Sequence, residues 1–247
     1  MTAILSAANV SKHYGAIRAV DDVSFTVAPG EIFGVIGPNG SGKTTLFNCV
    51  LGQIRPDAGR VAFQDREITG AGPLALSRLG IGRTFQSLQV FGGLTVRDNG
   101  IAAAQEHRGT LWSRLFAAPE IGLGAKADET LALFELTPHA GKLAGGLSYG
   151  QQKLLDMAMA FMADPALVML DEPAAGVNPR LIEMIRTLLL RLNRERGTTF
   201  VVIEHNMDFV MALCQRIMVL AEGRVLALGT PAEIRSNPAV LEAYLGA

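Results

Sequence analysis

Apolar residues along the chain occur in two patterns. In residues 3–31 they alternate with polar residues in short runs interrupted by Gly and Pro, as in antiparallel strands. Three other segments are continuous apolar runs: "IFGVIG" at 32–37, "ALVML" at 166–170 and "TTFVVI" at 198–203. Such runs are typical of parallel strands that are buried on both faces. The two patterns predict a mostly parallel sheet core with an N-terminal antiparallel part.

Helical patterns separate these strands. "KTTLFNCVLG" reads as a helix stopped by Gly52, and "PRLIEMIRTLLLRLNRERG" is amphipathic and ends at Gly197. Residues 95–164 are mostly helical, apart from "EHRGTLWSRLFAAPEIGLG", which we expect to be a loop. Strands alternating with helices predict an α/β fold whose sheet is covered on both faces. We therefore expect one domain, 1–247, with a helical subdomain inserted at about 88–163.

Two further segments predict smaller features. "GRVAFQDREI" suggests a strand pair, and "RIMVLAEGRVLALG" a hairpin that turns at Glu222 and Gly223. In "TPAEIRSN", Thr230 and Glu233 have the spacing of a helix capping box.

Composition narrows the class of protein. Of the 247 residues, 49% are hydrophobic and 18% charged, enough for a sizeable core. The net charge of −1 and the absence of a basic stripe argue against nucleic acid as a partner. Mean hydropathy is +0.28, but the apolar stretches are far shorter than the roughly 20 residues that span a bilayer. The N-terminus lacks the pattern of a signal peptide, and Cys49 and Cys214 are expected to be reduced core residues.

The stretch "GPNGSGKTT" lies between an apolar run and a helical pattern. It fits G-x-x-x-x-G-K-[ST], in which backbone N–H groups converge on phosphate oxygens and the following helix adds its positive end. Lys43 can reach the β- and γ-phosphates, and the Thr44 hydroxyl can ligate Mg²⁺. An ordinary glycine turn is the alternative, but the flanking strand and helix favour a nucleotide site. The residues of this site are Gly37, Pro38, Asn39, Gly40, Ser41, Gly42, Lys43, Thr44 and Thr45.

Asp171 and Glu172 follow the second apolar run, at the C-terminal end of a predicted strand. Open α/β sheets bind ligands at that edge. A solvated strand end is the alternative interpretation. Beside a phosphate-binding loop, we expect Asp171 to hold Mg²⁺ through water and Glu172 to polarise the attacking water.

Three other side chains are candidates because of their positions. His205 follows the third apolar run and could sense the γ-phosphate, although a lone histidine is more often structural. Gln86, in "RTFQSLQVF", could contact Mg²⁺ and the attacking water, or could simply be solvated. Tyr14, in "SKHYGAI", could stack on adenine or belong to the core.

A second glycine-rich stretch, "GGLSYGQQKLLDM" at 145–157, opens another helix. Backbone N–H groups at a helix start can meet an anion, yet the bulky Tyr149 stands among the small residues. The chain thus carries two phosphate-type stretches.

In chain order these motifs resemble those of the ATP-binding cassette (ABC) ATPase family across nearly the whole chain. They correspond to its A-loop, Walker A, Q-loop, signature, Walker B, D-loop and switch histidine: Tyr14, "GPNGSGKTT", Gln86, "LSYGQQ", "LVMLDEP", "GVNP" and His205. More narrowly, "RTFQSLQVFGGLTVRDN", "LDEPAAGVNP", "VIEHNMDFVM" and "NPAVLEAYLG" resemble the ATPase subunit of high-affinity branched-chain amino acid importers, the Liv type.

The resemblance implies a P-loop NTPase of the ABC ATPase type that uses ATP and Mg²⁺. Glu172, His205 and Gln86 would be catalytic, and Thr44, Gln86 and Asp171 would hold the metal. Two cassettes would pack head to tail, each ATP lying between the Walker A of one and the signature of the other. The implied signature contacts to a partner's ATP are Ser148, Gly150 and Gln151.

Two positions depart from the common family pattern. Tyr149 stands where many relatives have Gly, and Tyr at this position resembles the Liv type. It raises the question whether the position needs a glycine conformation. Asn178 stands in the D-loop where many relatives have Asp. Asn and Asp are both polar acceptors, so hydrolysis is still expected.

The implied function is the ATP-hydrolysing motor subunit of an ABC importer for branched-chain or related amino acids. Its partner cassette would be an identical chain or a second, different ATPase. The subunit would attach to integral membrane permeases at the cytoplasmic face of the cell membrane, and work indirectly with a periplasmic or extracellular substrate-binding protein. The Gln86 loop and the helical insertion are the predicted docking surface.

Three alternatives stay open at this point. An ATPase for lipid or lipopolysaccharide export is disfavoured only by the Liv-type motifs. A soluble ABC ATPase acting on nucleic acid is disfavoured by the single cassette and by the lack of heptads and basic excess. A nucleotide-binding regulator that does not hydrolyse is disfavoured by Glu172 and His205.

Overall fold

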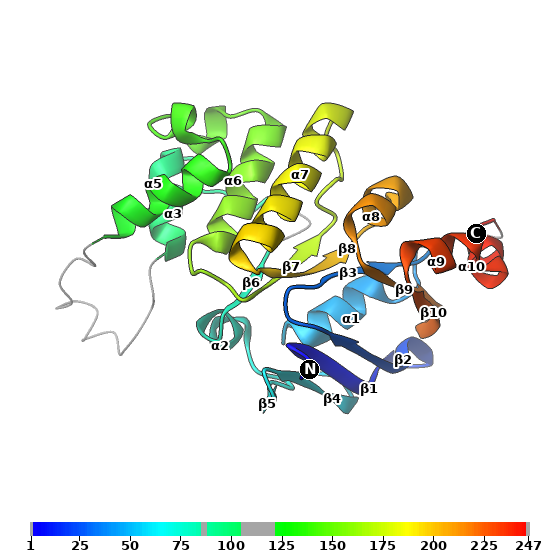
Figure 1. Ribbon diagram of the computed structural model, residues 1–247. Helices are drawn as coiled ribbons and strands as arrows, with labels where there is room; N and C mark the ends of the chain where they lie inside the picture. Colours follow the sequence, from blue (N-terminus) through cyan, green and yellow to red (C-terminus); the bar gives the residue numbers. More distant parts are fainter. Residues whose placement is uncertain (1, 85–87, 105–121, 246–247) are drawn as a thin grey trace.

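The computed structural model describes residues 2–84, 88–104 and 122–245, which contain two sheets (Figure 1). The first sheet has the strand order β2-β1-β4-β5, and every neighbouring pair is antiparallel. Its strands are β1 (Leu5–Tyr14), β2 (Ile17–Val27), β4 (Ala58–Phe63) and β5 (Arg66–Glu67). The predicted N-terminal antiparallel part and the predicted strand pair after Gly59 are confirmed.

The second sheet has six strands in the order β10-β9-β3-β8-β7-β6. They are β3 (Ile32–Ile36), β6 (Ile81–Arg83), β7 (Leu167–Asp171), β8 (Thr199–Ile203), β9 (Arg216–Ala221) and β10 (Arg224–Gly229). All its neighbouring pairs are parallel except the β9–β10 hairpin. Every residue of β3, β7 and β8 is buried, which explains why these strands read as continuous apolar runs.

Helices cover both faces of the six-stranded sheet. Helix α1 (Lys43–Val50) packs with the antiparallel sheet on one face, where Phe33 and Met169 point. Ile36 and Leu170 point to the opposite face, against the other helices. Those helices include α6 (Tyr149–Phe161), α7 (Pro179–Arg196), α8 (Met207–Leu213), α9 (Pro231–Ser236) and α10 (Pro238–Leu245). The predicted α/β layering is confirmed.

The chain between β6 and β7 is mostly helical in its described part, as predicted. It carries α3 (Val96–Ala104), α5 (Leu123–Leu133), α6 and two short 3₁₀ turns, η1 (Thr137–His139) and η2 (Ala144–Gly146). In Figure 1, α3, α5 and α6 lie together at one end of the molecule. The predicted loop at 106–124 falls almost entirely outside the described residues. Helix α2 (Pro73–Arg78) precedes β6.

The short local signals also appear as predicted. Gly197 ends α7 with φ 66°, in the left-handed region that favours glycine. Glu222 and Gly223 both have positive φ at the hairpin turn. Thr230 and Glu233 form the capping box of α9. Cys49 and Cys214 are both buried and free, and burial raises the pKa of the Cys49 thiol to about 11.

Candidate functional site

The P-loop, residues 37–45, connects β3 to α1 and is enclosed by its own chain. A Cβ atom on Gly37 would lie 2.2 Å from the Leu220 carbonyl oxygen of β9. One on Gly42 would lie 2.1 Å from the Ala19 carbonyl oxygen of β2. Both glycines also have positive φ, 153° and 100°. Glycine is therefore required at both positions by space as well as by conformation.

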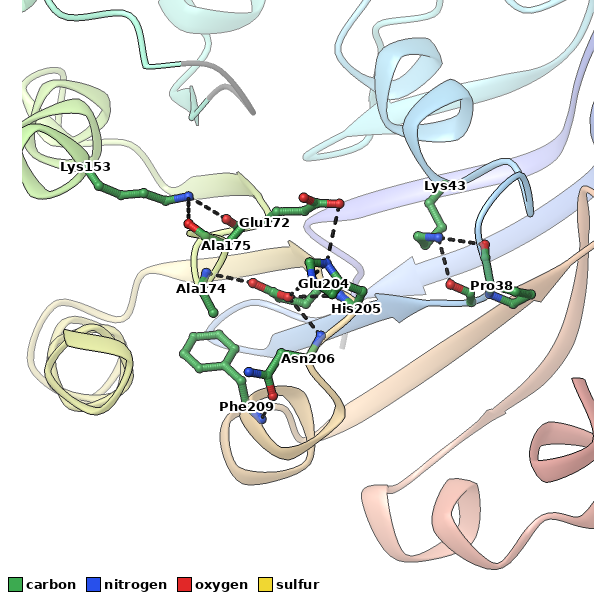
Figure 2. A network of polar contacts seen from close by, with 11 residues as sticks. Pro38, Lys43, Lys153, Glu172, Ala174, Ala175, Glu204, His205, Asn206 and Phe209 are labelled. Carbon is green, nitrogen blue, oxygen red and sulfur yellow. Dashed lines mark hydrogen bonds and ion pairs between the residues drawn. The ribbon is translucent and has the colours of Figure 1, made fainter. Parts of the chain in front are cut away.

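Three features of this loop suit an anion. Helix α1 begins at Lys43 with no side chain capping its first N–H groups. The Ser41 hydroxyl is buried and has no hydrogen-bond partner among the described residues. Lys43 Nζ donates to the carbonyl oxygens of Gly37, at 2.7 Å, and Pro38, at 2.9 Å (Figure 2). Burial lowers the pKa of this lysine, so its ammonium is short of solvation that a phosphate would supply.

The other P-loop residues are more accessible. Asn39 and Gly40 are exposed at the tip of the loop. Thr44 is exposed and Thr45 is partly buried, both in the first turn of α1.

The carboxyl ends of β7 and β8 bring three predicted residues to one edge of the sheet. Asp171 is the last residue of β7 and is 5% exposed, and burial raises the pKa of its carboxyl group. Glu172 follows it, and His205 follows β8. His205 Nδ1 lies 3.6 Å from Glu172 Oε1. Figure 2 shows the side chains of Glu172 and His205 on the side of the strands where Lys43 lies.

The backbone at Glu172 is unusual. Its φ is 49°, in the left-handed region, and the next residue is Pro173. A residue before proline normally has φ near about −120°. A non-glycine residue in the left-handed region costs about 1–3 kcal/mol and persists only where its surroundings impose it. The predicted water-activating carboxylate is thus held in a strained backbone.

The remaining two candidates lie elsewhere. Tyr14 ends β1 and is 48% exposed, with Lys12 Nζ 5.7 Å from its ring centroid. It belongs to the β1–β2 hairpin, which contacts the P-loop through Ala19. An exposed ring is available for stacking and is not part of the core. Gln86 falls outside the described residues.

The signature segment, residues 148–151, forms the start of α6. Ser148 is the N-cap, and its hydroxyl accepts from the Gln151 N–H, while Gln151 Oε1 accepts from the Ser148 N–H. Tyr149 is the first helical residue, so that position needs no glycine conformation. A Cβ atom on Gly150 would lie 2.4 Å from the Cδ2 methyl of Leu181 in α7, so a larger residue there would have to displace that side chain.

The signature segment opens onto a cavity of about 750 Å³. Its other lining residues come from η1, the turn before it, α6, the loop before α7 and α7, and include His139, Leu154, Asn178, Leu181 and Met184. No P-loop residue lines it. The structure therefore separates the two phosphate-type stretches within one chain. Asn178, the D-loop departure, is the N-cap of α7 and accepts from the Leu181 N–H at 2.9 Å.

Comparison with known proteins agrees with this geometry. The ABC transporter profile matches residues 20–175. The chain belongs to the ABC transporter family. The profile of the branched-chain amino acid ATP-binding cassette transporter matches residues 224–247. The high-affinity branched-chain amino acid transport ATP-binding protein LivG of Escherichia coli strain K12 is 37% identical over 249 residues, covering 98% of each protein.

Solved structures similar to this chain are also ATP-binding cassettes. An ATP-binding cassette of an ABC transporter in its ADP conformation is 35% identical, with a TM-score of 0.89 over 100% of both chains. A dimeric cassette in a post-hydrolysis state, bound to ADP and Pi, is 27% identical, with a TM-score of 0.78 over 92% of this chain and 98% of that one. The predicted fold, the predicted ATPase class and the Liv-type resemblance are confirmed.

Among the buried charged residues that were not predicted, Glu204 and Lys153 lie beside the loop after β7. Glu204 is fully buried, and its carboxylate accepts from the N–H groups of Ala174, His205 and Asn206 at 2.7, 2.9 and 3.0 Å (Figure 2). Lys153 of α6 is 5% exposed, and its Nζ lies 2.6 Å from the Glu172 carbonyl oxygen. Signals for both exist in the sequence. Glu204 ends an apolar run, and helical periodicity places Lys153 on the apolar face of α6.

Proposed function

We propose that this cassette is the ATP-hydrolysing subunit of an importer for branched-chain or related amino acids. The observation that carries the proposal is the meeting of Lys43, Asp171, Glu172 and His205 at one edge of the sheet. The match of the C-terminal residues 224–247 and the likeness to LivG support the choice of cargo.

ATP binding rests on the P-loop. The first N–H groups of α1 and the Lys43 ammonium supply positive charge, and Ser41 supplies a buried hydroxyl for a phosphate oxygen. When ATP binds, Lys43 exchanges the carbonyl oxygens of Gly37 and Pro38 for phosphate oxygens, which are stronger acceptors. The exposed ring of Tyr14 stacks on the adenine base. The loop residues Asn39, Gly40 and Thr45 complete the cradle.

The residues also fit Mg²⁺. Asp171 is a buried carboxylate whose pKa is raised by burial, an environment that a cation would relieve. Together with the Thr44 hydroxyl and Gln86 it offers the oxygen ligands that Mg²⁺ prefers, and Mg²⁺ in such sites usually takes its remaining ligands from phosphates and water. Bound Mg²⁺ would neutralise charge on the phosphates. The proposed ligand set contains only one carboxylate. Among the described residues, no group of three or more His, Cys, Asp and Glu side chains could hold a metal ion by itself.

Hydrolysis rests on Glu172 and His205. The Glu172 carboxylate orients the attacking water and takes its proton. His205, whose Nδ1 is 3.6 Å from Glu172 Oε1, faces the same edge and senses the γ-phosphate. Gln86 is the third group proposed to contact this water.

The signature segment completes the site of another cassette. Ser148 and the N–H groups of Gly150 and Gln151 lie at an exposed helix start, away from the P-loop of their own chain. A like-shaped cassette is dimeric with ADP and Pi. We therefore propose a head-to-tail dimer with an identical chain or a second ATPase.

The importer also needs membrane subunits. In the described residues, no helix has the length and apolar character to cross a bilayer. We propose that integral permease subunits hold the cassette at the cytoplasmic face of the membrane, and that a periplasmic or extracellular binding protein delivers the cargo. A groove of about 270 Å³ lies where α2 and β6 meet the helical subdomain proposed at about 88–163, lined in part by Pro73, Leu76, Ala103 and Met159. It suits a short segment of the permease.

Uptake by intact cells tests the proposal. Deleting the gene in the organism that encodes it should abolish uptake of radiolabelled leucine, isoleucine and valine. The wild-type gene should restore uptake, and the Glu172→Gln variant should not. Unchanged uptake of all three amino acids after deletion would contradict the proposed cargo. Restoration by Glu172→Gln would contradict the proposed role of Glu172.

A further inference from the structure

The loop after β7 is held from two sides by buried charges. On one side, Lys153 Nζ donates to the carbonyl oxygens of Glu172, at 2.6 Å, and Ala175, at 3.4 Å. On the other side, the Glu204 carboxylate accepts from the Ala174 N–H at 2.7 Å. Figure 2 shows Lys153 reaching this loop from one side and Glu204 from the other. Residues 172–175 are thus fixed by a cation on their carbonyl groups and an anion on an N–H group.

Lys153 binds the backbone of Glu172, the residue with the strained conformation, at its carbonyl oxygen. The Glu172 N–H donates to the Ile203 carbonyl oxygen at 2.9 Å, which continues the pairing of β7 with β8. Its carbonyl oxygen accepts from the Ala175 N–H at 3.1 Å and from Lys153 at 2.6 Å. The shortest of these contacts is the one from Lys153, and a hydrogen bond from a charged donor is roughly twice as strong as one from a neutral donor.

An ammonium at this position is costly to bury. Lys153 is 5% exposed and lies on α6 among Leu154, Met157 and other buried side chains. Both hydrogen-bond acceptors of its ammonium are neutral carbonyl groups. Burial lowers the pKa of Lys153, and nearby carboxylates, Glu204 foremost, offset this only in part. An apolar side chain would fill the helix face without this penalty. The placement of a cation here points to a specific task at the Glu172 carbonyl.

Lys153 also links two parts of the site. It lies about one turn beyond Gly150 on α6, the helix that begins with the signature segment. A shift of α6 that moves the signature segment therefore moves the ammonium relative to the Glu172 carbonyl. Glu204 adds a link to His205, because its carboxylate also accepts from the His205 N–H at 2.9 Å.

We propose that Lys153 is a positioning residue for hydrolysis: its ammonium holds the backbone of Glu172 so that the carboxylate points at the water-binding edge, and it thereby couples the signature helix to the water-activating group of the same chain. This inference rests on the proposed role of Glu172 as the group that activates water. Lys153 itself touches neither ATP nor water in this scheme.

The first test compares Lys153→Met with Lys153→Arg and with Lys142→Met. Met keeps much of the length but has no donor, Arg keeps a charged donor, and Lys142 is an exposed lysine of the same region. In Lys153→Met we expect kcat for ATP to fall about 10- to 100-fold, because misplacing a catalytic group by about 1 Å can cost about 10² in rate. The Kd for ATP, measured by calorimetry, should change less than about twofold. Lys153→Arg should recover most of the rate, and Lys142→Met should match wild type.

The second test asks whether Lys153 acts through Glu172. In single-turnover hydrolysis, adding Lys153→Met to Glu172→Gln should lower the residual rate by less than about twofold, since the group being positioned is already disabled. The same factor in both backgrounds would show independent action and overturn the proposal. An unchanged kcat in Lys153→Met would also overturn it, as would a loss explained entirely by weaker ATP binding.

Separate controls check that the variants fold and that Glu172 has the proposed role. Circular dichroism melting checks each variant, and if Lys153→Met does not fold, Lys153→Gln replaces it under the same criteria. Gln keeps an N–H donor but shortens the side chain and removes the charge. Full activity in Glu172→Gln alone would refute the role of Glu172 on which this inference rests, whereas the proposed function is tested separately by amino acid uptake in cells. Full activity in Lys153→Met with an inactive Glu172→Gln would refute only the positioning role.

Discussion

The P-loop and the signature segment are both glycine-containing stretches at a helix start, yet one chain completes only the first. The P-loop is enclosed by β2 and β9, and its cation is held by its own carbonyl groups. The strand ends supply Asp171, Glu172 and His205 beside it. The signature segment has Ser148 and Tyr149 exposed and opens onto a cavity lined without any P-loop residue.

This difference separates two roles of the same local structure. Folding of one chain is enough to enclose the phosphate-binding loop and to bring catalytic side chains to it. The helix start at Ser148 is already capped by its own side chains, so its shape is also set before any partner arrives. A rigid, exposed helix start is what a surface presented to another molecule requires.

The largest expected effect separates chemistry from binding. Glu172→Gln keeps the shape of the side chain and removes the base, and general-base catalysis contributes about 10²–10⁴ in rate. Steady-state phosphate release should fall by that factor, while the Kd for ATP from calorimetry stays within about threefold, since Lys43, Thr44 and Asp171 are unchanged. Turnover within about tenfold of wild type would place the base elsewhere.

The next effect tests whether Lys43 of the P-loop binds the phosphates. Lys43→Ala removes the buried cation of the loop, and hydrogen bonds to charged groups contribute about 1.5–3 kcal/mol. ATP affinity measured by calorimetry should therefore fall about tenfold or more, with the exposed Lys142→Ala as the matched control. Equal affinities in the two variants would remove Lys43 from the phosphate site.

A smaller effect concerns the hairpin beside the P-loop. Stacking of a base on an aromatic ring is worth about 1–3 kcal/mol, and the half-exposed ring of Tyr14 should contribute about 1–2 kcal/mol of this. Tyr14→Ala should weaken ATP and ADP alike, and Tyr14→Phe should be nearly silent, in fluorescence titrations. Equal losses in the two variants would instead indicate a contact made by the hydroxyl.

The smallest effect concerns the wall of the signature cavity. Asn178 caps α7, and replacing such a cap by Ala costs about 1 kcal/mol. Thermal unfolding should show that loss in Asn178→Ala, and Asn178→Asp should match wild type because Asp offers the same acceptor. A stability loss in Asn178→Asp as large as in Asn178→Ala would show that the amide does more than cap the helix.

The sequence was sufficient to predict features that depend on consecutive residues or on the regular arrangement of parallel strands. The P-loop occupies consecutive residues between a strand and a helix, so its motif carries its own context. Asp171 and His205 were predicted because the carboxyl ends of parallel strands meet at one edge. The capping box of Thr230 and Glu233 and the turn at Glu222 were predicted for the same reason.

The sequence was insufficient where a contact depends on tertiary placement. Glu172 before Pro173 favours an extended backbone, yet contacts with Ile203 and Lys153 hold it at φ 49°. Lys153 binds the Glu172 carbonyl group and Glu204 binds the Ala174 N–H group, and partners so distant along the chain leave no sequence pattern. The size of the cavity at the signature segment depends on how η1, α6 and α7 pack, which no motif specifies.

The central claim is that the signature segment completes the site of a second cassette, and light scattering tests it most directly. The Glu172→Gln variant, at high protein concentration with ATP and Mg²⁺, should dimerise, because bound ATP that is not cleaved bridges the P-loop of one copy and Ser148 of the other. Adding Ser148→Arg should abolish the dimer, since the bulky side chain would occupy the place of the γ-phosphate. Thr230→Arg, which disrupts a capping box of the same type on α9, should leave it intact. The same monomer–dimer balance with and without ATP would contradict a homodimer, and failure to pair with a second cassette as well would contradict the claim itself.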